Sequence, residues 1–156
     1  MNKIIYLLLV SLFFSCVKMD EKESSSLIKN SQSENIAFII DLKVNSNANE
    51  DLNLFIDEIT NTVAENEDFC LEYAYYISDD KSSVTLYEKY IDSKSAVTHG
   101  QNFIEGVFFE RFFNLFTLEK FIVTGSATKE FKDFTSDNGF VIDYRESVDG
   151  LSLIHI

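Results

Sequence analysis

The chain has 156 residues, a formal net charge of −13 and 46% hydrophobic residues, with 15 Phe, 7 Tyr and no Pro. This length fits one domain with short extensions, and the aromatic residues supply enough apolar volume for a real core. The negative charge argues against nucleic acid and against anionic lipid surfaces as partners. The sequence has no phosphate-binding glycine loop, no metal-spaced His/Cys cluster and no serine triad motif, so we predict no metal site.

The first 16 residues resemble the signal peptide of a bacterial lipoprotein. Lys3 gives a positive start, and the apolar run over 4–14 is too short to span a bilayer but long enough for an export signal. The run ends in Ser15-Cys16, which is similar to the motif at which lipoproteins are cleaved and lipidated. This resemblance implies a lipid anchor on Cys16 that holds the protein to a membrane of the bacterial cell envelope, at the outer membrane or facing the periplasm. The alternative is an ordinary secretory signal with an incidental cysteine.

The rest of the chain divides into three segments. Residues 17–35 are rich in Ser, Lys, Glu and Asn and are predicted to form a flexible tether. Residues 36–150 form the predicted folded domain, in which Cys70 lies in an apolar strand and is expected to be an inert thiol. Residues 151–156 resemble the translated read-through of a sequencing adapter. We therefore predict a non-native tail there and exclude His155 from every site argument.

Hydrophobic periodicity predicts alternating strands and helices in the folded domain. Their order is β-α-β-β-α-β, which is the α+β ferredoxin-like arrangement with an antiparallel sheet and two helices on one face. The other face of such a sheet is bare, and a second copy of the chain is its simplest partner, so we expect a homodimer. The predicted elements are a strand at 36–44, a helix capped by Asn47 with Glu50, strands at 69–78 and 83–91, a helical region from Asp92 to Phe116 with a bend or break at Gly106, a strand at 118–124, a helical turn at 128–134 and an edge strand at 140–147.

Glu88 is unusual because its carboxylate lies on the apolar face of a predicted strand. A carboxylate there is costly unless it is paired or reaches a cavity. His99 follows the helix start at Asp92 by two turns and is expected on the side of Ala96, facing the sheet. A contact between Glu88 and His99 would account for both groups, either as a structural pair or as a catalytic or ligand-binding pair. Glu88 shares its face with Val84, Leu86 and Tyr90.

Three stretches are similar to antibiotic-biosynthesis-monooxygenase-type domains, a dimeric α/β-barrel family. They are the turn and strand at 67–73, the run Leu86-Tyr87-Glu88-Lys89-Tyr90 and the helix start at 92–99 with its alanine and histidine. The resemblance implies two sheets packed face to face in a homodimer and a cavity in each subunit between sheet and helices. It also implies the oxidation of polycyclic aromatic phenols or quinols by molecular oxygen, which some members of the family carry out without metal, flavin or other cofactor. The absence of Trp counts against heme oxygenation.

The residues most suited to that chemistry are His99 and Glu88, which we predict to be catalytic. An imidazole has an ordinary pKa of about 6.5, which suits a base. Tyr90, Tyr73 and Phe103 are the predicted contacts to a small aromatic substrate. For the tyrosines at 73 and 75 the alternative is cross-strand packing with Tyr87. For the Phe-rich segment from 103 to 116, the alternative to a ligand-binding wall is core packing with a dimer contact.

Two functions therefore remain open. The first is a cofactor-independent monooxygenase-like enzyme that acts on a phenol or quinol outside the cytoplasm. The second is a non-catalytic lipoprotein whose barrel binds an apolar ligand or mediates association. A pocket filled by its own Phe side chains would favour the second function.

Overall fold

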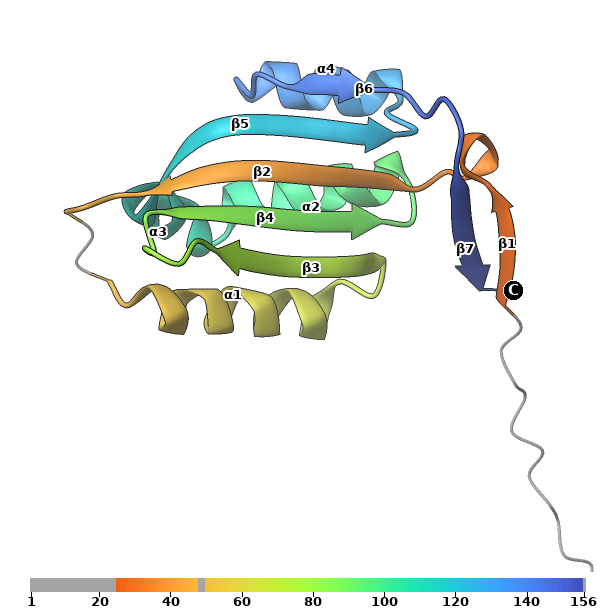
Figure 1. The fold of residues 1–156 in the computed structure, drawn as a ribbon. Coiled ribbons are helices and arrows are strands. Elements are labelled where there is room, and N and C mark those ends of the chain that lie inside the picture. Colours follow the sequence, from red (N-terminus) through yellow and green to blue (C-terminus); the bar gives the residue numbers. More distant parts are fainter. Residues whose placement is uncertain (1–24, 48–49, 156) are drawn as a thin grey trace, which may run out of the picture.

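The computed structural model describes residues 25–47 and 50–155. Five strands form one sheet, and a separate two-stranded ribbon stands at one end of it (Figure 1). The elements in chain order are β1 Ser25–Lys29, a 3₁₀ turn Asn30–Gln32, β2 Ile36–Val44, α1 Leu52–Asn66, β3 Cys70–Ile77, β4 Ser83–Tyr90, α2 Ser93–Glu105, α3 Phe108–Leu115, β5 Phe116–Gly125, α4 Lys129–Asp137, β6 Asp143–Arg145 and β7 Leu151–His155.

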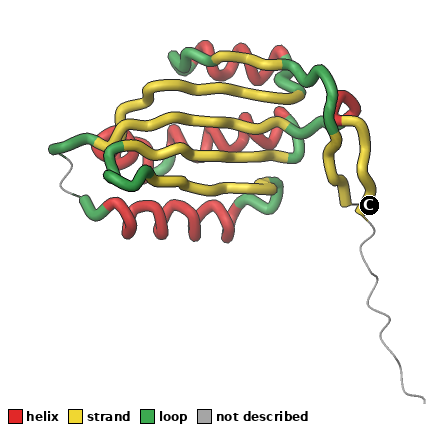
Figure 2. Tube along the Cα trace, in the orientation of Figure 1, coloured by secondary structure: helices red, strands yellow, loops and turns green. Residues whose placement is uncertain are grey.

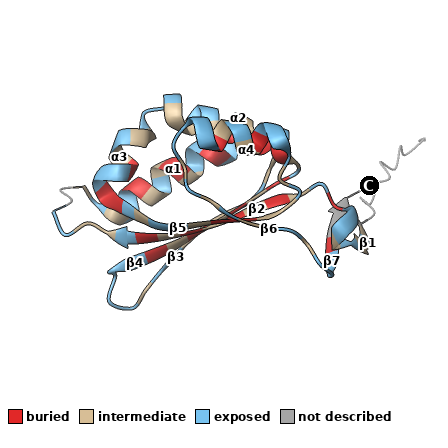
Figure 3. Ribbon diagram, turned by 90° about the horizontal axis from the view of Figure 1, so that it is seen from above, coloured by how far each residue is buried: buried red, intermediate tan, exposed pale blue. Residues whose placement is uncertain are grey.

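The large sheet has the strand order β3-β4-β2-β5-β6 (Figure 2). Neighbouring strands are antiparallel except β5 and β6, which are parallel. The β-α-β-β-α-β unit runs from β2 to β5, so the predicted ferredoxin-like α+β fold is confirmed. The helices α1 to α4 all lie on one face of the sheet, and the other face is left bare (Figure 3).

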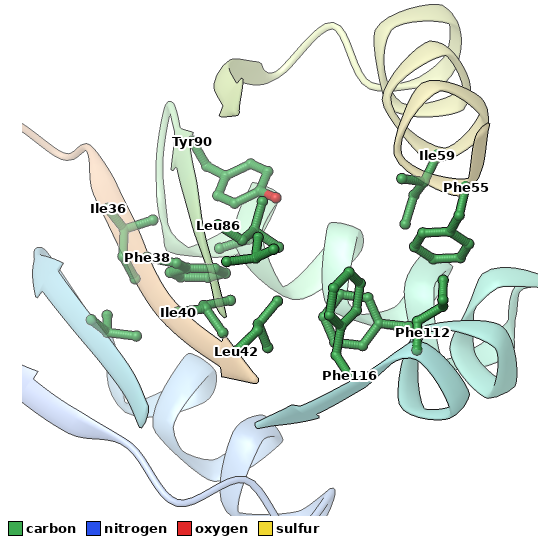
Figure 4. Close-up of a cluster of buried hydrophobic side chains, with 14 of the residues drawn as sticks. Ile36, Phe38, Ile40, Leu42, Phe55, Ile59, Leu86, Tyr90, Phe112 and Phe116 are labelled. Carbon is green, nitrogen blue, oxygen red and sulfur yellow. The ribbon is translucent and has the colours of Figure 1, made fainter. Parts of the chain in front are cut away.

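Buried and partly exposed side chains alternate along β2 and β4, and the buried ones belong to the core. In β2, every second residue from Ile36 to Leu42 is buried, and in β4 every second residue from Val84 to Tyr90 is buried as well. The register pairs Phe38 with Glu88, so the carboxylate lies on the helix-covered face as predicted. Figure 4 shows the two parts of this core, one along β2 and β4 and the other between α1, α3 and the start of β5.

The predicted cap of the first helix is wrong. Asp51, not Asn47, precedes the first helical residue with an extended backbone, and its Oδ1 accepts a hydrogen bond from the N–H of Leu54 at 3.0 Å. Glu50 instead accepts a hydrogen bond from Nε of Arg111 at 2.8 Å and so ties the start of α1 to α3. A cap must stand next to the first helical turn, and the later start of α1 leaves Asn47 outside it.

Gly106 ends α2, and the chain re-enters a helix at Phe108, as expected from the glycine. A Cβ at Gly106 would lie 2.6 Å from the backbone O of Asn102, so only glycine fits this junction without displacement. The last part of the domain differs from the prediction. Helix α4 continues to Asp137, and the edge strand predicted at 140–147 is confined to Asp143–Arg145.

The termini of the described chain meet in the small ribbon. Strand β1 pairs with β7 in antiparallel register. Strand β7 lies in the segment predicted to be a non-native tail, so its pairing with β1 does not test the tether predicted at 17–35. The tether and the non-native tail both remain predictions. The predicted signal peptide and Cys16 lie outside the described residues. Over 25–47 and 50–155, no helix is long and apolar enough to cross a membrane.

Candidate functional site

Helix α2 carries His99 to the sheet. Asp92 caps the start of the helix: its Oδ1 accepts a hydrogen bond from the N–H of Ser95 at 2.7 Å and so stabilises the first turn. His99 lies two turns further on, buried on the same side as Ala96. The predicted orientation of His99 toward the sheet is therefore observed.

Two carboxylates flank the imidazole of His99. Nε2 lies 3.6 Å from Oε2 of Glu88, so the structure brings together the pair that the sequence predicts. Nδ1 lies 2.7 Å from Oε2 of Glu67, a contact that the sequence does not reveal. Glu67 directly follows the last residue of α1, in the connection to β3, and it is only 6% exposed. Hydrophobic periodicity cannot predict the contact because Glu67 lies in a turn. Glu67 is, however, the first residue of the family-like stretch at 67–73.

Neutral donors complete the cluster. The hydroxyl of Tyr90 donates to Oε2 of Glu88 at 2.8 Å, and Nδ2 of Asn102 donates to Oε1 of Glu67 at 2.9 Å. Across the described part of the chain, every fully buried side-chain nitrogen and oxygen has a hydrogen-bond partner. The three ionisable groups thus form a connected buried network, which is the condition for keeping charges in a core.

The network shifts all three pKa values. Burial raises the pKa of Glu88 above 4.5 by more than the charge of His99 and the bond from Tyr90 lower it. Burial also works against the charged forms of Glu67 and His99, but their mutual hydrogen bond and the neighbouring charges outweigh it. The pKa of Glu67 therefore lies below 4.5 and the pKa of His99 lies above 6.5.

A cavity of about 70 Å³ opens beside this network between the sheet and the helices. Glu88 and His99 form its polar end, and nearly all the remaining lining residues are apolar. Of the predicted substrate contacts, Tyr73 and Phe103 line the cavity, whereas Tyr90 is fully buried and reaches it only through its bond to Glu88. Partly exposed Phe side chains from α2, α3, α4 and the following loop form the outer wall: Phe103, Phe113, Phe134 and Phe140.

Tyr73 and Tyr75 do not pack on Tyr87, and that alternative is wrong. In the observed register Tyr73 is opposite Glu88 and Tyr75 is opposite Leu86, on the helix-covered face, whereas Tyr87 is opposite Ala74 on the bare face. The hydroxyls of Tyr73 and Tyr75 are 3.1 Å apart. Burial, the Tyr75 hydroxyl and the carboxylate of Glu88 raise the pKa of Tyr73 well above 10, so this hydroxyl stays protonated.

Cys70 lies at the start of β3 and is half-buried. Burial and the charges of Glu88 and Glu67 raise its pKa to about 12. A thiol with this pKa is protonated at neutral pH and a weak nucleophile, in agreement with the inert role predicted for it. Within 25–47 and 50–155, no group of three or more His, Cys, Asp or Glu side chains could hold a metal ion.

No known family model matches the chain, and no curated protein matches it in sequence. Among solved structures, MupZ from Pseudomonas fluorescens is similar over 77% of this chain and 95% of its own, with 17% identity and a TM-score of 0.62. Protein SO0527 from Shewanella oneidensis matches over 63% and 92%, with 20% identity and a TM-score of 0.42. A proposed antibiotic biosynthesis monooxygenase from Caulobacter crescentus CB15 matches over 80% and 91%, with 14% identity and a TM-score of 0.39. The likeness to MupZ supports the fold alone.

Proposed function

We propose that the protein binds a small phenol- or quinol-type molecule in the aromatic cavity and that the His99–Glu88 pair removes its hydroxyl proton. The observation that carries this proposal is the placement of the pair: both side chains line one end of a cavity that is otherwise almost wholly apolar. An aromatic ring would lie among Phe side chains, and its hydroxyl would meet the carboxylate of Glu88 and the imidazole of His99.

The chemistry that follows is of the monooxygenase type that three stretches of the sequence resemble. A deprotonated phenol is electron-rich and can reduce molecular oxygen, so the protein must supply proton transfer, orientation and exclusion of water. In the overall reaction one oxygen atom enters the ring, giving a quinone, and the other leaves as water with the two displaced hydrogens. Tyr73 stays protonated at the cavity wall, where its hydroxyl shares a hydrogen bond with the hydroxyl of Tyr75.

The size of the cavity restricts the ligand. A volume of about 70 Å³ is well below the range of roughly 300–1,000 Å³ of most ligand sites. A polycyclic molecule requires the Phe side chains of the outer wall to move, so we propose a single-ring ligand. The same observation favours the second function, in which those Phe side chains fill the barrel and the protein is a non-catalytic binding or association module.

Oxygen uptake and thermal shift, measured together on the full chain under air, separate the two functions. With single-ring phenols and quinols we expect oxygen uptake and a rise in Tm, because a ligand that binds only the folded state stabilises it. Replacing His99 by Ala should lower turnover by about 100-fold or more, the usual contribution of a positioned proton-transfer group.

The control variant is Thr98→Ala, at the position just before His99 in α2. The hydroxyl of Thr98 donates only to the backbone O of Lys94 in the same helix. This variant should keep wild-type turnover. A rise in Tm without oxygen uptake would establish the binding module and end the enzymatic proposal. Turnover that survives in a folded His99→Ala variant would remove the histidine from the reaction.

A further inference from the structure

We propose that His99 acts as a fixed cation held by Glu67, and that Glu88 is the group that takes the proton from the bound ligand. This division of roles rests on the proposed function, because the proton comes from the ligand described there. It also assigns a part to Glu67, which positions His99 without lining the cavity.

The two ring nitrogens of His99 both face carboxylates. A neutral imidazole has one N–H donor and one lone-pair acceptor, whereas an ionised carboxylate can only accept. If Nδ1 donates to Glu67 at 2.7 Å and the ring is neutral, the lone pair of Nε2 points toward Oε2 of Glu88 at 3.6 Å, and two acceptors repel each other. The imidazolium removes this conflict, since it presents an N–H to each carboxylate.

Among the described residues, the groups that face the ring carry no other positive charge. Glu67 faces His99 from the turn between α1 and β3, Glu88 and Tyr90 face it from β4, and Tyr73 faces it from β3. Within the described ranges, His99 is the only ion-pair partner of either carboxylate, because each salt bridge of a Lys or Arg goes to another acidic residue. A neutral His99 would leave two buried carboxylates without a counter-charge, which is costly.

Glu88 has one carboxylate oxygen free for the ligand. Its Oε2 receives both the hydroxyl of Tyr90 and the contact with Nε2 of His99. Its Oε1 has no hydrogen-bond partner among the described residues, and since no fully buried side-chain oxygen lacks a partner there, Oε1 reaches the cavity that Glu88 lines. Burial raises the pKa of Glu88, which makes its carboxylate a stronger proton acceptor than an exposed one.

The proton step is balanced within these groups. The O–H bond of the ligand breaks, a bond forms between its proton and Oε1 of Glu88, and the electron pair stays on the ligand oxygen. The negative charge thereby moves from Glu88 to the ligand, where Nε2–H of His99 can donate to it. The total charge of Glu67, His99, Glu88 and the ligand does not change, so no charge enters or leaves the buried site.

The charge on His99 is measurable without a ligand. The full chain carries two histidines, so a His155→Gln variant leaves the ring nitrogens of His99 as the only imidazole signals in NMR. At about pH 8, where an ordinary imidazole is neutral, we expect both nitrogens of His99 to be protonated. Adding Glu67→Gln should return the ring to the neutral form at this pH. Adding the control change Asp68→Asn, which removes a charge from an exposed neighbour in the same turn, should not. A neutral ring in the His155→Gln protein would overturn the assignment.

A nitrophenol, whose phenolate absorbs visible light, tests the role of Glu88. In the full chain we expect bound nitrophenol to be the phenolate below its solution pKa, and in the isosteric Glu88→Gln variant to be the neutral phenol. Phenolate that persists in Glu88→Gln would place the proton acceptor elsewhere and overturn the assignment. No binding of any phenol would overturn the proposed function and the role of Glu88 with it, whereas the NMR result decides the charge on His99 independently.

Discussion

The protonation states of three buried groups depend on one another: those of His99, Glu67 and Glu88. The imidazole bonds Glu67 through Nδ1 and faces Glu88 through Nε2, all three side chains being buried. Water does not screen such a cluster, so the protonation of one group changes the pKa of its neighbours. The cluster should therefore appear in the pH dependence of folding as well as in any chemistry at the cavity.

We expect the free energy of unfolding to decrease as the pH rises above 6.5. The pKa of His99 is raised in the folded state, so the folded protein keeps a proton that the unfolded chain has lost. This stabilisation is complete below 6.5 and is lost as the pH passes through the raised pKa. The raised pKa of Glu88 acts in the same direction from 4.5 upward, whereas the lowered pKa of Glu67 gives stability that is lost only as the pH falls below 4.5.

Urea denaturation at a series of pH values measures this dependence, with a slope of up to about 1.4 kcal/mol per pH unit for one linked proton. A His99→Gln variant should lose the decrease above pH 6.5. His155→Gln, which removes the other histidine, should retain it. A wild-type stability that stays constant or rises over this range would contradict the raised pKa of His99.

Among the secondary-structure elements, strand β5 depends on the glycine at its end for its connection to α4. Strand β5 runs antiparallel to β2 and ends at Gly125, opposite Ile36, before the chain turns into α4. Gly125 has φ of +94°, a conformation that residues with a Cβ rarely adopt, and a Cβ there would overlap the backbone O of Asn35. The junction is therefore tight because of both the backbone conformation and the neighbouring chain.

Replacing Gly125 by Ala should lower the free energy of unfolding by about 2–4 kcal/mol, the sum of a positive-φ cost and a backbone displacement. Gly139→Ala is the matched control. Gly139 has φ of +79° but nothing within 4 Å of a Cβ, so only the conformational cost of about 1–2 kcal/mol applies. Equal losses in chemical denaturation of the two variants would show that the contact with Asn35 does not matter.

The sheet face opposite the helices carries an apolar centre with polar residues on either side. An apolar row crosses four strands in register, from Ala74 through Tyr87 and Ile39 to Ile122. None of the described helices α1 to α4 covers this face, as Figure 3 shows. Polar pairs flank the row, among them Asp41 with Thr85, whose hydroxyl donates to Oδ1 of Asp41 at 3.0 Å. An apolar centre with a polar border is the usual anatomy of a protein interface.

We propose that two copies of the chain pack through this row, in keeping with the homodimer expected from the sequence. Sedimentation of the full chain at micromolar concentration should give the mass of a dimer. Ile39→Lys places a charge at the centre of the row and should give a monomer, because burying an unpaired charge is costly. Leu54→Lys, on the exposed side of α1, should remain a dimer. A monomeric wild-type protein would refute this interface.

Several features of this protein follow from local sequence patterns alone. The alternation in 83–91 predicts that Glu88 is on the buried face, and the spacing after Asp92 predicts that His99 faces the sheet. Gly106 likewise indicates the break between two helices. Each depends on the period of one element or on the backbone preference of one residue, and both are properties of a short stretch of chain.

The contacts between residues of different elements depend on how the whole chain packs. Glu67 lies in a turn, where no period predicts its direction, and it reaches His99 because α1 and α2 cover the same face of the sheet. The alternative that Tyr73 and Tyr75 pack on Tyr87 is wrong because a shift of one residue in strand register exchanges the two faces, and the sequence does not specify that register. The cavity volume likewise depends on how Phe side chains from several elements pack, which no single stretch of sequence specifies.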